Sequence, residues 1–112
     1  MSAPRLNRAL VLEARVPEPD GAGGYVEVWE AVGTLWAEVL AGTGRHVAAD
    51  QIAASSVPYR ITVRAAPSGA PSRPRPDQRF RDGLRVFRIL AVAERDGAAR
   101  YLTCFAEEEV PA

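Results

Sequence analysis

The sequence predicts a mainly β protein, a small antiparallel β-barrel of about six strands with one short helical insertion and a long proline-rich loop. Three observations carry this prediction. Short runs alternate apolar and polar residues, as strands with one buried face do. Residues 66–78, APSGAPSRPRPDQ, hold four prolines. Finally, an Asp96-Gly97 pair, a dipeptide favoured in two-residue hairpin turns, separates two apolar runs near the C-terminus.

The 112 residues are expected to form a single domain, 1–112. No apolar run reaches the roughly 18 residues of a membrane span, and the N-terminus lacks the apolar core of a signal peptide, so no membrane association is expected. The single cysteine, Cys104, lies in an apolar run and excludes an internal disulfide. We expect it to behave as a small hydrophobe.

The N-terminal half predicts three strands. Residues 9–16 form the first, and the following PEPDGAGG, residues 17–24, predicts a loop because proline lacks a ladder donor and glycine disfavours order. Strand character resumes over 25–32 and again over 35–40. The short Gly33-Thr34 interruption predicts that these two are neighbouring antiparallel strands.

The segment 45–56 is alanine-rich and free of proline and glycine, which predicts a short helix ending at Val57-Pro58. Residues 59–65 then alternate cleanly, with Tyr59, Ile61 and Val63 on one face. Beyond the proline-rich loop, residues 85–93 and 99–106 predict a hairpin about Asp96-Gly97.

Charge is unevenly distributed along the chain. Every basic residue except His46 is an arginine, and residues 60–88 carry a net charge of +6, whereas residues 1–59 and 89–112 each carry −3. Such polarity suits head-to-tail contact between copies, or an anionic partner for the middle segment.

The residue pattern predicts no enzyme, metal site or cofactor. His46 is the single histidine, and Cys104 lacks a flanking catalytic motif. His46 and Asp50 stand four apart, but two ligands do not make a metal site. The GAGG of residues 21–24 lacks the lysine of a phosphate-binding loop, and Glu107 to Glu109 fit a solvated charge patch.

A nucleic-acid-binding module is the alternative function that the residues themselves suggest. Five arginines in the segment 73–88 would bind phosphates if they clustered, namely Arg73, Arg75, Arg79, Arg81 and Arg85. Only Phe80 and Phe87 lie close by as stacking aromatics, so a base-stacking platform has weak support.

The order of motifs carries a family resemblance. Gly24, Trp29, LWAEV (35–39), an alanine-bearing insert, ITVR (61–64) and the hairpin FRILAVAERDGAARYLTC follow one another. From about Arg5 to Glu108 the chain resembles the SPP1-type phage head–tail adaptor family, also called head–tail joining, stopper or head completion proteins, with versions in gene transfer agents. It departs from the family in its longer, proline-rich segment after ITVR.

The resemblance implies a structural connector in the neck of a phage or phage-like particle, assembled in the bacterial cytoplasm. It implies a small β-barrel that forms a ring, a dodecamer, between a portal-side adaptor and a tail-side terminator or tail protein, with double-stranded DNA passing through the channel. Two segments are candidates for a channel-lining loop: 42–56, which contains Gly42, Gly44, Arg45 and His46, and 66–78.

Partner or ring contacts are expected at Glu107, Glu108 and five of the arginines in the segment 73–88, namely Arg73, Arg75, Arg79, Arg81 and Arg85. One or both of Trp29 and Trp36 are expected to anchor the barrel core, each burying about 150–250 Å². If either proves exposed, an interface hot spot is the better interpretation.

Overall fold

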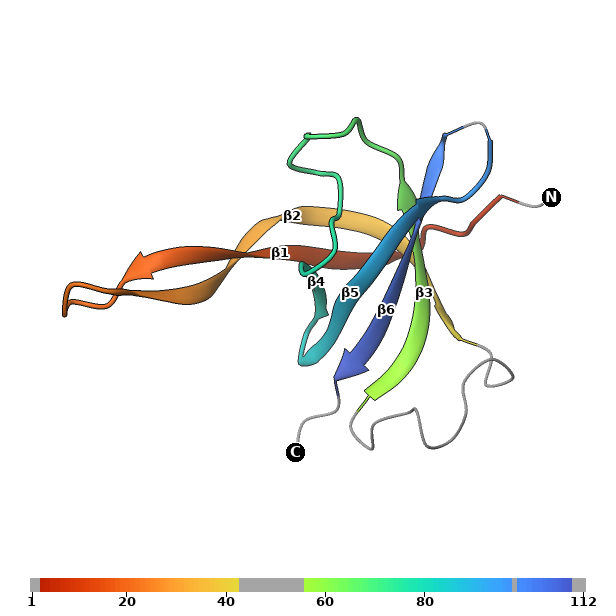
Figure 1. The fold of residues 1–112 in the computed structure, drawn as a ribbon. Coiled ribbons are helices and arrows are strands. Elements are labelled where there is room, and N and C mark those ends of the chain that lie inside the picture. The colour runs from red at the N-terminus through yellow and green to blue at the C-terminus, as the bar shows by residue number, and fades with distance from the viewer. Residues whose placement is uncertain (1–2, 43–55, 98, 110–112) are drawn as a thin grey trace.

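The computed structural model describes residues 3–42, 56–97 and 99–109, and all regular structure within them is β (Figure 1). Six antiparallel strands close a barrel in the order β1-β2-β3-β6-β5-β4. This confirms the mainly β, antiparallel prediction. The strands are β1 (Arg8–Pro19), β2 (Tyr25–Ala41), β3 (Ser56–Arg64), β4 (Arg79–Asp82), β5 (Arg85–Glu94) and β6 (Tyr101–Glu109).

The predicted helix over 45–56 lies outside the described residues apart from Ser56, which begins β3. Val57 and Pro58 continue that strand instead of ending a helix. The carbonyl oxygen of Pro58 accepts a hydrogen bond from the Gly42 N–H at 2.8 Å, so the missing donor of Pro58 does not break the sheet here. No helix in the described part of the chain is long and apolar enough to cross a membrane.

Residues 25–40 form one strand rather than the two predicted. β2 runs unbroken for 17 residues, and Gly33-Thr34 is not a turn. Instead the register against β1 shifts between Leu12 and Glu13, where Leu12 pairs with Gly33 but Glu13 pairs with Ala31. Val32 is therefore the extra residue of a β-bulge. A bulge bends a strand and increases its twist, which lets one long strand serve both the barrel and an extension beyond it.

That extension is a two-stranded arm, residues 14–31, which projects from the barrel (Figure 1). It includes Pro17 and Pro19, so the prediction of a loop over 17–24 was wrong for its first residues. The Asp20 N–H donates to Gly24 O at 3.1 Å and therefore points toward β2. Successive backbone nitrogens of a strand point in opposite directions. Those of Pro19 and Pro17, one and three positions before Asp20, therefore face the open edge. Proline is tolerated there because no ladder donor is needed.

A tight turn lies at a different Asp-Gly pair, Asp82-Gly83. Asp82 pairs with Arg85, so only Gly83 and Leu84 join β4 to β5, and Gly83 has a φ of 62°. Glycine at the first turn position accepts this φ. The short strand β4 was not predicted. The predicted turn at Asp96-Gly97 is instead a wider loop from 95 to 100, in which Ala99 takes the positive φ of 55°.

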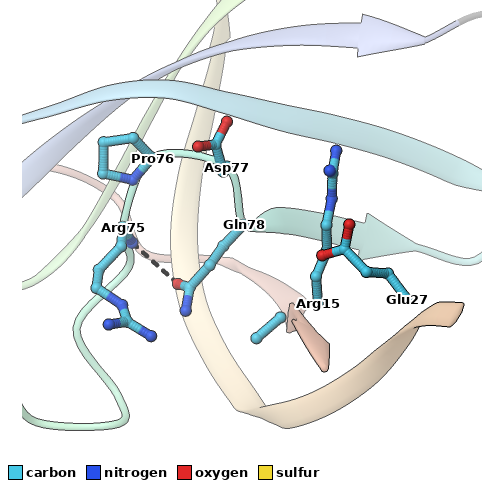
Figure 2. A pocket seen from close by; sticks show the side chains of 7 residues that line it. Arg15, Glu27, Arg75, Pro76, Asp77 and Gln78 are labelled. Carbon is cyan, nitrogen blue, oxygen red and sulfur yellow. Dashed lines mark hydrogen bonds between the residues drawn. The ribbon is translucent and has the colours of Figure 1, made fainter. Parts of the chain in front are cut away.

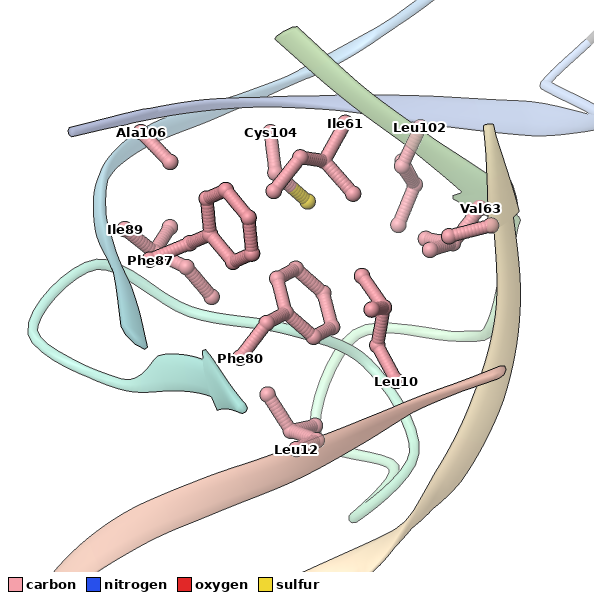
Figure 3. Close-up of a cluster of buried hydrophobic side chains, with 11 residues drawn as sticks. Leu10, Leu12, Ile61, Val63, Phe80, Phe87, Ile89, Leu102, Cys104 and Ala106 are labelled. Atoms are coloured by element: carbon pink, nitrogen blue, oxygen red, sulfur yellow. The ribbon is translucent and has the colours of Figure 1, made fainter. Parts of the chain in front are cut away.

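The barrel is filled by side chains from all six strands (Figure 3). Phe80 and Phe87 pair across β4 and β5 at its centre, and Tyr59 packs edge-on against Phe87 with ring centroids 5.2 Å apart. The expected alternation in β3 is confirmed for Ile61 and Val63, which are fully buried. The other core residues are Leu10, Leu12, Ala37, Ile89, Leu102, Cys104 and Ala106.

Cys104 is a core residue, as its apolar surroundings predicted. Burial raises the pKa of its thiol to about 12, so the reactive thiolate is scarce at neutral pH. We expect a thiol reagent at pH 8 to label Cys104 at least about 1000-fold more slowly in the native protein than in guanidinium, since reaction requires opening of the barrel. Stopped-flow absorbance with an aromatic disulfide measures both rates. Rapid native labelling would contradict this burial.

Candidate interaction surfaces

The arginines of the segment 73–88 do not form one cluster. The proline-rich loop that carries Arg73 and Arg75 lies against the barrel, with Pro74 fully buried and backbone bonds from Asp77 N to Ile89 O (3.0 Å) and Ile89 N to Gln78 O (2.9 Å). Arg73 Nη1 donates to Ala66 O at 2.8 Å. The loop is thus held in place by the sheet.

A groove of about 520 Å³ separates this loop from the base of the arm (Figure 2). Arg75 and Asp77 line it from the loop, and Arg15 and Glu27 line it from the arm. The Arg75 N–H donates to Gln78 Oε1 at 2.9 Å, which fixes the loop wall. Because the groove presents two cations and two carboxylates, it does not single out an anionic ligand.

Arg79 and Arg81 are joined to β1 by a single buried carboxylate. Both project outward from β4 on either side of the inward Phe80, and Glu13 of β1 lies between them. Arg79 Nε donates to Glu13 Oε1 at 2.6 Å, and Arg81 Nε donates to Oε2 at 2.8 Å. This clamp ties β4 to β1, where they share only three paired positions.

Two opposing effects set the pKa of Glu13. Burial disfavours the charged form and would raise the pKa. The hydrogen bonds and positive charges of Arg79 and Arg81 outweigh burial and hold the pKa below the ordinary value of 4.5. Glu13 is therefore ionised at neutral pH, and it neutralises part of the cationic segment.

The two tryptophans are not core residues, contrary to the prediction. Trp29 lies at the base of the arm between the guanidinium groups of Arg15 and Arg79, which are 5.0 and 4.1 Å from its ring centroid. It extends the clamp through cation–π contacts. Trp36 is 60% exposed on β2. Its exposure favours the alternative expectation, an interface residue.

Arg85 is also paired within the chain. Its Nε and Nη2 donate to the two carboxylate oxygens of Glu108 at 2.7 and 3.0 Å, and Nη2 donates to the Tyr59 hydroxyl at 3.2 Å. The hydrogen bond from Arg85 lowers the pKa of Glu108, and the same pairing raises the pKa of Arg85. The Arg85 guanidinium also lies 4.9 Å from the Phe87 ring centroid, over the core.

The remaining predicted residues are scattered. Glu107 is half-buried on β6, paired across the sheet with Arg88 and Pro58. Gly42 follows β2, and a Cβ there would lie 3.2 Å from the Pro58 oxygen, so glycine allows a close approach. Gly44, Arg45 and His46 lie outside the described residues.

Sequence reasoning missed the partners of these arginines. Glu13 lies within the first predicted strand, and nothing local links it to residues 66 and 68 positions away. The alternation Arg79-Phe80-Arg81 was the available signal for a strand with a cationic outer face. Three arginines of the cationic segment thus pair with acids of the two acidic segments, whereas the Arg8–Asp82 pair has the opposite polarity. Among residues 3–42, 56–97 and 99–109, no group of acidic, histidine and cysteine side chains forms a metal-binding cluster.

Comparison with known proteins gives a consistent result. The family model for phage head completion proteins matches residues 1–109. A chain in the virion of a native gene transfer agent particle is 60% identical, with a TM-score of 0.80, over 98% of this chain and 100% of that one. A Shigella flexneri 2a protein of known solution structure is 23% identical, with a TM-score of 0.69 over 96% of both chains, and supports the fold alone. No curated protein matches the chain.

Proposed function

Because this chain belongs to the family of phage head completion proteins, we propose that it is the structural connector that joins the DNA-filled head to the tail. The observation that carries the proposal is the 60% identity, along the full length, to a chain of a native gene transfer agent virion. The TM-score of 0.80 shows that the two proteins share their fold. A virion structural role also needs no catalytic group, in line with the expectation that the protein is not an enzyme.

In this role the protein forms a ring, a dodecamer, between a portal-side adaptor and a tail-side protein, and DNA passes through the channel. Such a ring forms when one surface of each copy binds a different surface of the next copy and the rotation from copy to copy adds up to a full turn. The exposed arm and the barrel wall of this chain are two unlike surfaces. Arg73, Arg75, Glu107 and residues 42–46 remain candidates for partner or channel contacts.

The alternative, a nucleic-acid-binding module built on residues 73–88, has less support. Three of the five arginines expected to bind phosphates, Arg79, Arg81 and Arg85, donate to carboxylates of the same chain. A guanidinium held by a carboxylate contributes little to phosphate binding. We expect the purified protein to leave the mobility of duplex DNA unchanged at physiological salt.

The connector role predicts a specific failure of assembly. Deleting the gene from a particle-producing strain is expected to yield DNA-containing heads without tails, or heads that have lost DNA, when particles are viewed by negative-stain electron microscopy. Supplying the wild-type chain from a plasmid is the control and is expected to restore tailed particles. Intact, tailed particles from the deletion strain would contradict the proposed function.

A further inference from the structure

The arm, residues 14–31, has no neighbouring strand in the described chain. β1 pairs with β4 only at Val11–Glu13, and β2 pairs with β3 only at Ala37–Ala41, so the arm strands pair only with each other. An isolated two-stranded hairpin is marginally stable in water. An arm of this length therefore gains stability when it packs on another surface.

The tip of the arm is preorganised for such a contact. Asp20 Oδ1 accepts hydrogen bonds from the N–H groups of Ala22 (2.7 Å) and Gly24 (3.1 Å), which also lower the pKa of the carboxyl. Gly21 and Gly23 take φ values of 82° and 87°, which only glycine adopts without strain. A rigid tip loses little conformational entropy on docking.

The tip offers an aromatic ring beside negative charge. Tyr25 is 72% exposed, and Glu27 lies two residues along β2 and so on the same face. Val26 is also exposed, on the opposite face. The arm as a whole carries four carboxylates and one guanidinium, a net charge of −3, which leaves +3 on the rest of the chain.

The outer wall of the barrel offers the matching surface. Leu40, Arg60 and Phe105 form one row across β2, β3 and β6, because Arg60 pairs with Leu40 on one side and with Phe105 on the other. Leu40 is 46% and Phe105 42% exposed, and Arg60 between them is exposed too. These three residues contribute to a wall groove of about 280 Å³, whose charged lining is Arg60 and Arg95 together with the carboxylates Glu38 and Glu94. The groove as a whole is therefore not cationic, and the match to the arm lies in the row itself, where the Arg60 cation stands between two exposed apolar side chains.

We infer that the arm of one copy docks in the wall groove of the next copy. Tyr25 packs against Leu40 and Phe105, and Glu27 lies beside Arg60. Arm and groove are different surfaces of one chain, so the contact is heterologous and repeats from copy to copy until the ring closes. The inference rests on the proposed function, since it names the contact by which the connector ring is held together.

Disulfide trapping in assembled particles tests this contact. Tyr25 and Leu40 lie fifteen positions apart on β2, about 50 Å along the strand, whereas a disulfide requires Cα atoms within about 7 Å. In the double variant Tyr25→Cys/Leu40→Cys, any disulfide between these positions therefore joins two chains. The expected result on a non-reducing gel of oxidised particles is a ladder of linked chains. The matched control is Tyr25→Cys/Leu84→Cys, because Leu84 is exposed but lies outside the wall groove; it is expected to form no ladder.

A charge swap gives a second readout that does not require native residues at Tyr25 and Leu40. In particles that also carry the double cysteine variant, Arg60→Glu is expected to weaken the ladder, and Glu27→Arg combined with Arg60→Glu is expected to restore it. Tailed particles that contain the double cysteine variant but show no ladder would overturn the inference and leave the connector role intact. Linkage of Tyr25→Cys to another particle protein would also overturn it. If the double cysteine variant does not assemble, the test uses the two charge variants without cysteines, and the measurement is the yield of tailed particles. Arg60→Glu is expected to lower this yield, and adding Glu27→Arg is expected to restore it. A yield that Arg60→Glu does not lower, or that Glu27→Arg does not restore, would overturn the contact.

Discussion

Phe87→Ala is expected to lower the free energy of unfolding by about 3–5 kcal/mol, which is most of the stability of a typical small domain. Phe87 is fully buried at the centre of the barrel, pairs with Phe80 and packs against Tyr59. Alanine would leave a cavity surrounded by rigid strands. The ring also lies under the Arg85 guanidinium, so its loss removes a cation–π contact. Denaturant unfolding followed by circular dichroism measures the change.

Phe105→Ala is the matched control for this prediction. It removes the same side chain from the adjacent region of sheet, but Phe105 points outward and is 42% exposed. We expect a change of about 1 kcal/mol or less. A large loss of stability for Phe105→Ala, or a small one for Phe87→Ala, would contradict the assignment of inner and outer faces. If the wall groove binds the arm, Phe105→Ala should lower tail joining while leaving the isolated domain folded.

Glu13→Ala is expected to cost about 2–4 kcal/mol of unfolding free energy. Removing one partner of a buried ion pair leaves the other charge uncompensated, which costs about 3–5 kcal/mol when the remaining charge is fully buried. Here two guanidiniums lose their acceptor, but both are partly exposed and water replaces part of the interaction. Trp29 is also affected, because Arg79, which stacks on it, is no longer held in place. Chemical denaturation of both proteins at pH 7 measures the difference.

The Arg8–Asp82 pair, whose side chains are 36% and 35% exposed, provides the comparison. Asp82→Asn removes a charge from an ion pair at the surface, where such pairs contribute about 0–1 kcal/mol. A cost for Asp82→Asn equal to that for Glu13→Ala would show that burial of the clamp is not the source of its stability.

The pH dependence of stability follows from the same clamp. The folded-state pKa of Glu13 lies below its ordinary value of 4.5, so the stabilisation is fully present above about pH 5 and is lost as pH falls through the folded pKa. Glu108 acts in the same direction because Arg85 lowers its pKa. The difference in unfolding free energy between wild type and Glu13→Ala is expected to shrink as the pH is lowered from 5 to 3. A difference that stays constant over this range would contradict the ionised clamp.

Local patterns in the sequence predicted the inner face of the barrel well. The alternation around Ile61 and Val63, and the apolar setting of Cys104, correspond to buried positions in the structure. The prediction of strand boundaries was wrong for β2, which belongs both to the barrel and to the arm. Gly33-Thr34 resembled a turn, yet β2 passes through it because a bulge opposite Leu12 absorbs the bend. A bulge depends on the partner strand, so no single segment encodes it.

Local patterns in the chain were enough to establish the β class, the buried positions Ile61, Val63 and Cys104 and, through the order of the motifs, the family. Periodicity is a property of neighbouring residues, so it can be read without knowing the fold. Only the tertiary structure decided the functional surfaces. The register of β1 with β4 brings Glu13 to Arg79 and Arg81, and the register of β5 with β6 brings Glu108 to Arg85. Four of the expected contact residues are therefore already paired within the chain. Within the described residues, the same closure leaves the arm without a neighbouring strand. Such pairings join segments that are distant in the chain, so local patterns in the sequence do not reveal them.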